Sequence, residues 1–371
     1  GVAANSAGAD WSAKMQEFAQ TLRTLAPELA HDEVRDPAAL KKGAAAIARL
    51  SHELESGPMA NSPLKSDPGA RHVLASLHRE AQRAQELLES GNLAYGRALL
   101  RGITSYCVAC HSRSDSGPKF SELVGSVDLT GLEPLARAET LASLRNFDAA
   151  MTEYGAIVRD KNAAQMNPFD WERALRSGLA IAIRVFQDPK RAQAFLKSAA
   201  AGSAPEFLRE QIASWSRSIT RWQSTHEKTP VTPKEKLALA RRLVHDALLT
   251  QDYPADRAAD VEYLRATALL HDALEKPTDN APPLTGLERA EGLYLAGQSS
   301  EALQDLYLWS THEFYYEDCI HAAPAAKEGQ RCYRRLEATL YRGYTGSRGT
   351  QIPKSVVEHL AELRAEAFGQ K

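Results

Sequence analysis

Apolar side chains recur every three or four residues along most of this chain, which predicts amphipathic helices. The first apolar stripe consists of Met15, Phe18, Leu22 and Leu25. Asp10 precedes this stripe and is a favourable N-cap residue. We therefore expect the first helix to begin at Asp10, after a flexible N-terminus formed by residues 1–9.

Aspartate followed by proline predicts the start of the next two helices, since proline suits the first helical position. These pairs are Asp36-Pro37 and Asp67-Pro68. Gly91 is typical of a helix C-terminus and ends the third helix. A fourth helix continues to His111 and ends at Gly117-Pro118. Four amphipathic helices with short connections indicate an antiparallel four-helix bundle.

The pattern from residue 133 onward remains helical and contains no strand signal. Residues 145–151 and 297–303 each resemble the turn and second-helix start of a tetratricopeptide repeat, with a small alanine that lets two helices approach. Proline marks further helix starts at Asp188-Pro189, Ala204-Pro205, Thr232-Pro233 and Ile352-Pro353. We expect an all-α chain that ends in a tetratricopeptide-like α-solenoid of about ten helices.

The composition narrows the class of protein without identifying it. The 371 residues suffice for two or three domains, and the formal net charge of −2 gives no reason to expect binding to nucleic acid or to a membrane surface. No apolar run approaches the ~18 residues of a spanning helix, so we expect no transmembrane segment. The small residues at positions 1–8 are typical of a mature N-terminus.

The strongest chemical motif in the chain is Cys107-Val108-Ala109-Cys110-His111. Cys-x-x-Cys-His is the attachment motif of a c-type haem. Two thiols add to the two vinyl groups of one porphyrin, so they must lie about one helical turn apart on the same side. The adjacent histidine then lies under the iron as an axial ligand. The motif predicts one covalently bound haem c at Cys107, Cys110 and His111.

Two other kinds of site use the same cysteine spacing. A redox-active dithiol is expected in a βαβ neighbourhood, and this sequence predicts none. A zinc site would need a second close cysteine pair, and Cys319 and Cys332 are too widely spaced to supply one.

The remaining two cysteines predict a disulfide. Haem is attached outside the bacterial cytoplasm, so the haem motif predicts an exported, periplasmic protein in an oxidising compartment. The connection between Cys319 and Cys332 contains Pro324 and Gly329 and can fold back on itself. We expect the bond at the base of a helical hairpin.

A haem motif at the end of the fourth helix of a bundle resembles the class II c-type cytochromes, the cytochrome c′ and c556 group. The resemblance covers residues 10–120 and rests on the motif, the helix count and Met15. It implies that Met15 is the sixth iron ligand, as in the c556 branch. Tyr106 adjoins Cys107 and is expected to flank the porphyrin.

The chain departs from that family directly after the motif. The family has an aromatic and a basic residue three and four positions after the haem histidine, where this chain has Ser114 and Asp115. Arg113 is the nearest cation and is the candidate for a basic residue that binds a haem propionate.

The identity of the sixth ligand stays open at this point. Met15 shares its stripe with Phe18 and would also suit a packed core. The rivals are His72, His78 and Met59, and the iron would be five-coordinate if it resembled the c′ branch.

These inferences combine into one expected organisation. Residues 10–120 form the class II cytochrome-like bundle, residues 121–132 a linker, and residues 133–371 the helical array. We expect electron transfer by a mono-haem cytochrome, with the array docking an unidentified redox partner protein. A haem-based gas sensor or scaffold with an open iron is the alternative. An enzymatic role ranks third, because we locate no second haem and no distal acid–base pair.

Overall fold

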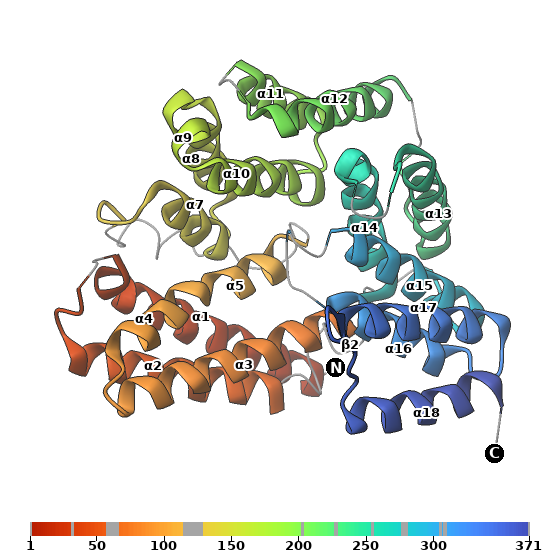
Figure 1. Ribbon diagram of the computed structural model, residues 1–371, viewed down its shortest axis with the longest axis horizontal. Helices are drawn as coiled ribbons and strands as arrows, with labels where there is room; N and C mark the ends of the chain where they lie inside the picture. Colours follow the sequence, from red (N-terminus) through yellow and green to blue (C-terminus); the bar gives the residue numbers. More distant parts are fainter. Residues whose placement is uncertain are drawn as a thin grey trace. The chain divides into compact units, whose positions relative to one another are not determined.

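The computed structural model describes residues 2–30, 33–56, 67–113, 129–201, 204–225, 229–253, 256–275, 281–303, 306 and 310–369, and the side chains of these residues other than 2–10 and 275. Helices make up nearly all of these ranges, so the chain is all-α as predicted (Figure 1). The strands in these ranges are the short antiparallel pair β1 (Thr345–Gly346) and β2 (Gly349–Thr350).

The chain forms two compact units. Unit 1 comprises residues 1–65, 70–226 and 306–308, and unit 2 comprises residues 66–69, 227–305 and 309–371. Unit 1 therefore continues beyond the predicted linker at 121–132 and takes in the first part of the predicted array. Residues 121–128 of that linker lie outside the described residues.

Five helices of the N-terminal part carry the pattern described above. They are α1 (Val2–Ala30), α2 (Pro37–Ser56), α3 (Pro68–Glu89), α4 (Leu93–Gly102) and α5 (Thr104–His111). α1 starts before Asp10 and takes in residues that we assigned to a flexible N-terminus. The segment before Asp10 is rich in alanine, the strongest helix former, so the helix continues past the expected cap.

The aspartate–proline starts are confirmed. The Asp36 carboxylate accepts hydrogen bonds from the backbone N–H groups of Ala38 and Ala39, at 3.0 and 2.9 Å, and α2 begins at Pro37. Gly91 adopts a φ of +88° between α3 and α4, as its place at a helix end requires.

The expected fourth helix is divided in two. α4 ends at Gly102 and α5 begins at Thr104. At the junction the Ile103 N–H bonds to the Leu100 carbonyl, which tightens the turn. The expected end at Gly117-Pro118 lies outside the described residues.

The apolar faces of these helices form one core. Its buried members include Phe18, Leu25, Leu40, Ile47, Leu50, Leu54, Leu74, Leu77, Ala81, Leu88, Leu100 and Ile103. Met15, Tyr106 and Cys107 are partly buried and pack against this core.

The rest of unit 1 is also helical. Its helices are α7 (Pro134–Ser143), α8 (Phe147–Arg159), α9 (Lys161–Met166), α10 (Pro168–Ala180), the π-helical turn η2 (Ile181–Val185), α11 (Pro189–Ala201), the short 3-10 turn η3 (Glu206–Leu208) and α12 (Arg209–Ser224). The helix–turn–helix predicted around residues 145–151 is present as α7 and α8. Arg145 forms the turn with a φ of 58°, and the Asn146 side chain caps α8 by accepting a bond from the Ala149 N–H.

Unit 2 is built from consecutive helices that pack on one another. They are α13 (Pro233–Thr250), α14 (Asp260–Glu275) with the short turn η4 (Arg257–Ala259) before it, α15 (Gly286–Ala302), α16 (Thr311–Ala322), α17 (Lys327–Gly343) and α18 (Lys354–Phe368). Each of them contacts the next, and α13 also contacts α15, α15 contacts α17 and α16 contacts α18. The start predicted at Thr232-Pro233 is confirmed by a capping box between Thr232 and Glu235.

The second predicted repeat turn, at residues 297–303, is wrong. Gly297 and the residues up to Ala302 lie inside α15. The glycine is there for packing, because a Cβ at this position would overlap the ring of Tyr316 on α16. Close contact between two helices therefore explains the residue that the sequence suggested as a turn.

The predicted disulfide is confirmed. Cys319 on α16 and Cys332 on α17 are bonded, with their Cα atoms 6.1 Å apart. Both side chains are fully buried.

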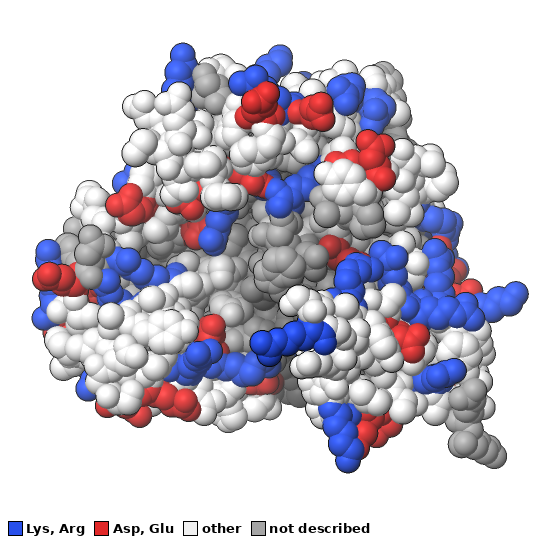
Figure 2. All heavy atoms as spheres, viewed as in Figure 1, with Lys and Arg blue, Asp and Glu red and all other residues white. Residues whose placement is uncertain are grey.

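The surface carries mixed charge. Figure 2 shows lysine and arginine side chains interspersed with aspartate and glutamate over the visible face, in keeping with the small net charge. Among the described residues, no helix combines the length and the apolar character needed to cross a bilayer.

Candidate functional site

The three motif residues lie in the last two turns of α5. Cys107 and Cys110 are three positions apart and His111 follows Cys107 by four, which places all three on one side of the helix. Each of the three is partly buried, whereas Ala109 is buried. The local helix therefore presents two thiols and one imidazole together.

These side chains open into one apolar pocket of unit 1. Its lining residues are Met15, Phe18, Ala19, Leu22, Leu54, Val73, Leu74, Leu77, Tyr106, Cys107, Cys110, His111, Ser143 and Leu144. The pocket thus brings together Met15, Tyr106 and the motif, which are far apart in sequence. Arg113 follows α5, is buried and lies outside this lining.

The space in this pocket is small. Its volume is about 40 Å³, whereas sites that bury a cofactor-sized molecule measure about 300–1,000 Å³. A second cavity of about 300 Å³ adjoins it and shares Leu22, Ser143 and Leu144. The donor groups are those that a haem needs, whereas the pocket as it stands is smaller than a site that buries a cofactor.

His111 has a defined orientation. Its Nδ1 lies 2.5 Å from the carbonyl oxygen of Ser143 on α7, so Nδ1–H donates this bond. The lone pair then resides on Nε2, the nitrogen that a metal would bind.

The charge state of His111 also suits ligation. Burial and the positive charge of Arg145 lower the pKa of His111 to about 4, although the bond to Ser143 acts in the opposite direction. The imidazole is therefore neutral at pH 7, and the neutral ring is the form that binds metals.

Sequence reasoning missed the contribution of α7 and the turn after it. Arg145 donates a hydrogen bond to the His111 carbonyl at 3.1 Å, and its side chain is buried. The turn at 145–146 was visible in the sequence as a repeat-like motif. Nothing in the sequence indicated that this turn packs against α5.

The alternative use of the cysteines as a redox-active dithiol is disfavoured. Burial raises the pKa of the Cys107 thiol to about 12, although part of the side chain can be reached from the pocket. Reactive dithiols depend on a lowered pKa and often lie at a helix N-terminus, whereas this motif ends α5. No disulfide joins Cys107 to Cys110.

The other candidates for the sixth ligand either do not line the pocket or lie outside the described residues. His72 is buried, but its neighbours Val73 and Leu74 line the pocket in its place. His78 faces His52, with ring centroids 5.0 Å apart. Met59, Ser114 and Asp115 lie outside the described residues.

The interpretation of this site rests on its own residues, because comparisons with known proteins found no match. No protein-family model matches this sequence, and neither the curated proteins nor the solved structures contain a match to the chain.

Proposed function

We propose that this chain is a mono-haem c-type cytochrome that transfers electrons to or from a partner protein. The observation that carries the proposal is the convergence of Cys107, Cys110, His111 and Met15 on one apolar pocket. Two thiols and an adjacent histidine are the residues that covalent haem attachment needs.

Each of these residues has a defined part. Cys107 and Cys110 would hold the haem through thioether bonds, and His111, whose ring is held by Ser143, would supply a nitrogen ligand to the iron. Leu54, Leu74 and Leu77 exclude water from the pocket. When bound, haem supplies a one-electron couple between ferric and ferrous iron.

Met15 is proposed as the second axial ligand. It lines the pocket from α1 and is partly buried, so its thioether is shielded from solvent. A histidine–methionine pair would leave the iron no open position and would raise its reduction potential, which suits electron transfer better than gas binding.

Charged side chains near the pocket fit the same proposal. The buried Arg145 guanidinium beside His111 favours the less positive, ferrous state of an iron held there. Arg23 and Arg101 line the adjoining cavity, and we assign them to the carboxylates of the porphyrin. Arg113, the nearest cation to the motif in the sequence, is not among the lining residues of either cavity.

We further propose that the helices of unit 2 dock the redox partner and that the protein acts in the periplasm. Stacked helices expose long surfaces suited to protein binding. The buried Cys319–Cys332 disulfide fits an oxidising compartment.

The deciding experiment is the mass of the denatured protein. The chain is exported in a bacterial host that attaches haem c, and intact mass is recorded in acid. We expect the mass of the chain plus one haem, and no added haem in Cys107→Ala/Cys110→Ala. The variant Cys319→Ala/Cys332→Ala is the matched control and retains the haem. Haem that acidified organic solvent extracts from the wild type would contradict covalent attachment.

A further inference from the structure

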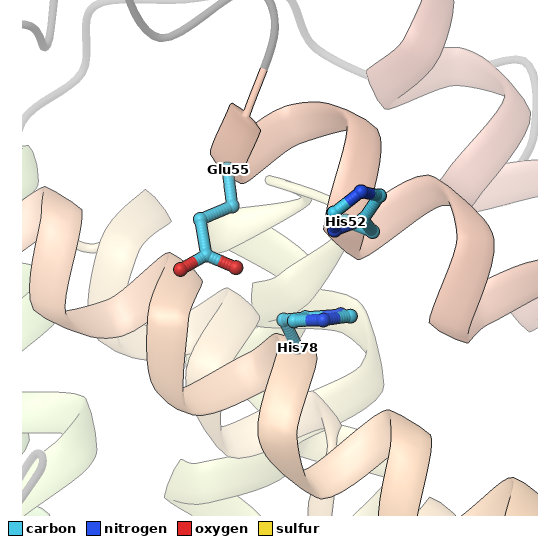
Figure 3. A group of neighbouring side chains, drawn as sticks. All are labelled: His52, Glu55 and His78. Carbon is cyan, nitrogen blue, oxygen red and sulfur yellow. The ribbon is translucent and has the colours of Figure 1, made fainter.

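A second group of metal-ligating side chains lies in unit 1, outside the lining of this pocket. His52 and Glu55 are three residues apart on α2, and His78 comes from α3. Figure 3 shows the three side chains converging on one space. One ligand atom from each lies within 4.8 Å of the others, and no other such group of three occurs among the described residues.

We propose that His52, Glu55 and His78 bind a transition-metal ion of the Zn²⁺ type. Two imidazoles and one carboxylate form a donor set that suits Zn²⁺ and Cu²⁺, whereas Ca²⁺ and Mg²⁺ prefer sites made of oxygen ligands alone. Three protein ligands leave the fourth position of a tetrahedral zinc ion to water.

The spacing needs only a small adjustment. Ligand atoms around a tetrahedral zinc ion lie about 3.3 Å apart, as the metal–ligand distances of about 2.0–2.1 Å require. The separations of up to 4.8 Å therefore close by rotation of side chains that are exposed or half-buried.

A buried serine orients His78 for ligation. The Ser51 hydroxyl donates to the Ala48 carbonyl at 2.9 Å, and its Oγ lies 3.4 Å from Nδ1 of His78. Because the serine proton is engaged, the Oγ lone pair accepts from Nδ1–H. Nε2 of His78 then carries the lone pair that a metal needs, and the serine acts as an outer-shell partner of the ligand.

The carboxylate of Glu53, which also lies on α2, forms ion pairs outside this group. Glu53 pairs with Lys14 at 2.5 Å and with Arg49 at 2.8 Å. Glu55 is the carboxylate that faces the two rings (Figure 3).

The proposed ion would link two helices that line the pocket. Leu54 adjoins Glu55 on α2, and Leu77 adjoins His78 on α3, and both leucines line the pocket. Binding to the folded state alone would therefore stabilise this part of unit 1. The inference does not depend on the haem.

The experiment is a Zn²⁺ titration by calorimetry. Cys107 and Cys110 are occupied beforehand, by haem as purified or by iodoacetamide, so they bind no zinc. The wild type should bind one ion at the site and show a thermal midpoint that rises with zinc concentration. His52→Gln and His78→Gln should weaken binding at least tenfold and abolish this rise.

Two further variants separate the site from other histidines. His359 lies 3.2 Å from Glu317 in unit 2, so His359→Gln is the matched control and should bind zinc as the wild type does. Ser51→Ala should weaken binding by about 10- to 100-fold through the orientation of His78. Unchanged binding in His52→Gln and His78→Gln, or its loss in His359→Gln, would overturn the proposal. Failure of haem attachment would leave these outcomes unaffected.

Discussion

Two histidines of unit 1 are oriented by the same device. His111 donates its Nδ1–H to the Ser143 carbonyl, and His78 donates its Nδ1–H to the Ser51 hydroxyl. In both rings the lone pair on Nε2 is directed away from the hydrogen-bond partner. A metal-binding role for either residue is therefore encoded partly in a side chain or backbone group that no motif includes.

Replacing Met15 distinguishes two roles of this residue, as an iron ligand or as a core residue alone. As an iron ligand, it should produce the charge-transfer band of methionine bound to ferric haem, and Met15→Ala should remove the band and lower the reduction potential. As a core residue alone, it should contribute only to packing. In both cases the truncation removes partly buried surface and should destabilise the protein by about 2 kcal/mol.

Optical spectra and urea unfolding of the haem-loaded protein distinguish these cases. Met166 is 86% exposed, so Met166→Ala is the matched control and should change neither the spectrum nor the stability. A Met15→Ala spectrum identical to that of the wild type, with the stability loss present, would limit Met15 to the core.

Helix boundaries were predictable where the signal is local. Proline and its preceding aspartate fixed the start of α2 because the cap and the ring act within one turn. The break at Ile103 was not predictable, since no proline marks it. Gly297 shows the limit most clearly, because its role depends on a ring from a different helix.

Gly297→Ala tests that packing role. The added methyl group would overlap the Tyr316 ring, and overpacking of this kind costs about 1–3 kcal/mol. Tyr316 has little freedom to move, since it is buried and its hydroxyl donates to Glu301 at 2.9 Å. We expect a matching fall in the free energy of unfolding, measured with urea.

Gly343→Ala is the control for this substitution. A Cβ at Gly343 meets nothing within 4 Å, so alanine should be neutral or slightly stabilising in this last residue of α17. Equal losses in the free energy of unfolding of the two variants would show that the absence of a side chain at Gly297 is not what lets α15 and α16 approach.

At the scale of the molecule, the sequence predicted the arrangement of the motif residues better than it predicted their surroundings. The Cys107–His111 motif is contiguous, so its geometry follows from one helix. The pocket wall formed by Ser143 and Leu144 comes from beyond the predicted linker. Long-range packing of that kind leaves no periodic trace in a single sequence, and the division into units near residue 226 was missed for the same reason.

Removing the Cys319–Cys332 disulfide tests whether helices of unit 2 can lose stability while unit 1 keeps its own. The bond joins α16 and α17 across a sequence separation of 13 residues, and both sulfurs are buried. A loop of this length contributes about 3 kcal/mol in the chain-entropy model. Cys319→Ala/Cys332→Ala should therefore raise the opening equilibrium of these helices by about 100-fold.

Hydrogen exchange followed by mass spectrometry resolves this effect by peptide. Backbone amides of α16 and α17 should lose protection by about two orders of magnitude, because each opening of the hairpin now gains the entropy that the bond had removed. Amides of α2 should exchange as in the wild type, since that helix packs within the core of unit 1. Loss of protection spread evenly over α2, α16 and α17 would instead mean that the two units open as one, and unchanged exchange in α16 would mean that helix packing alone holds the hairpin.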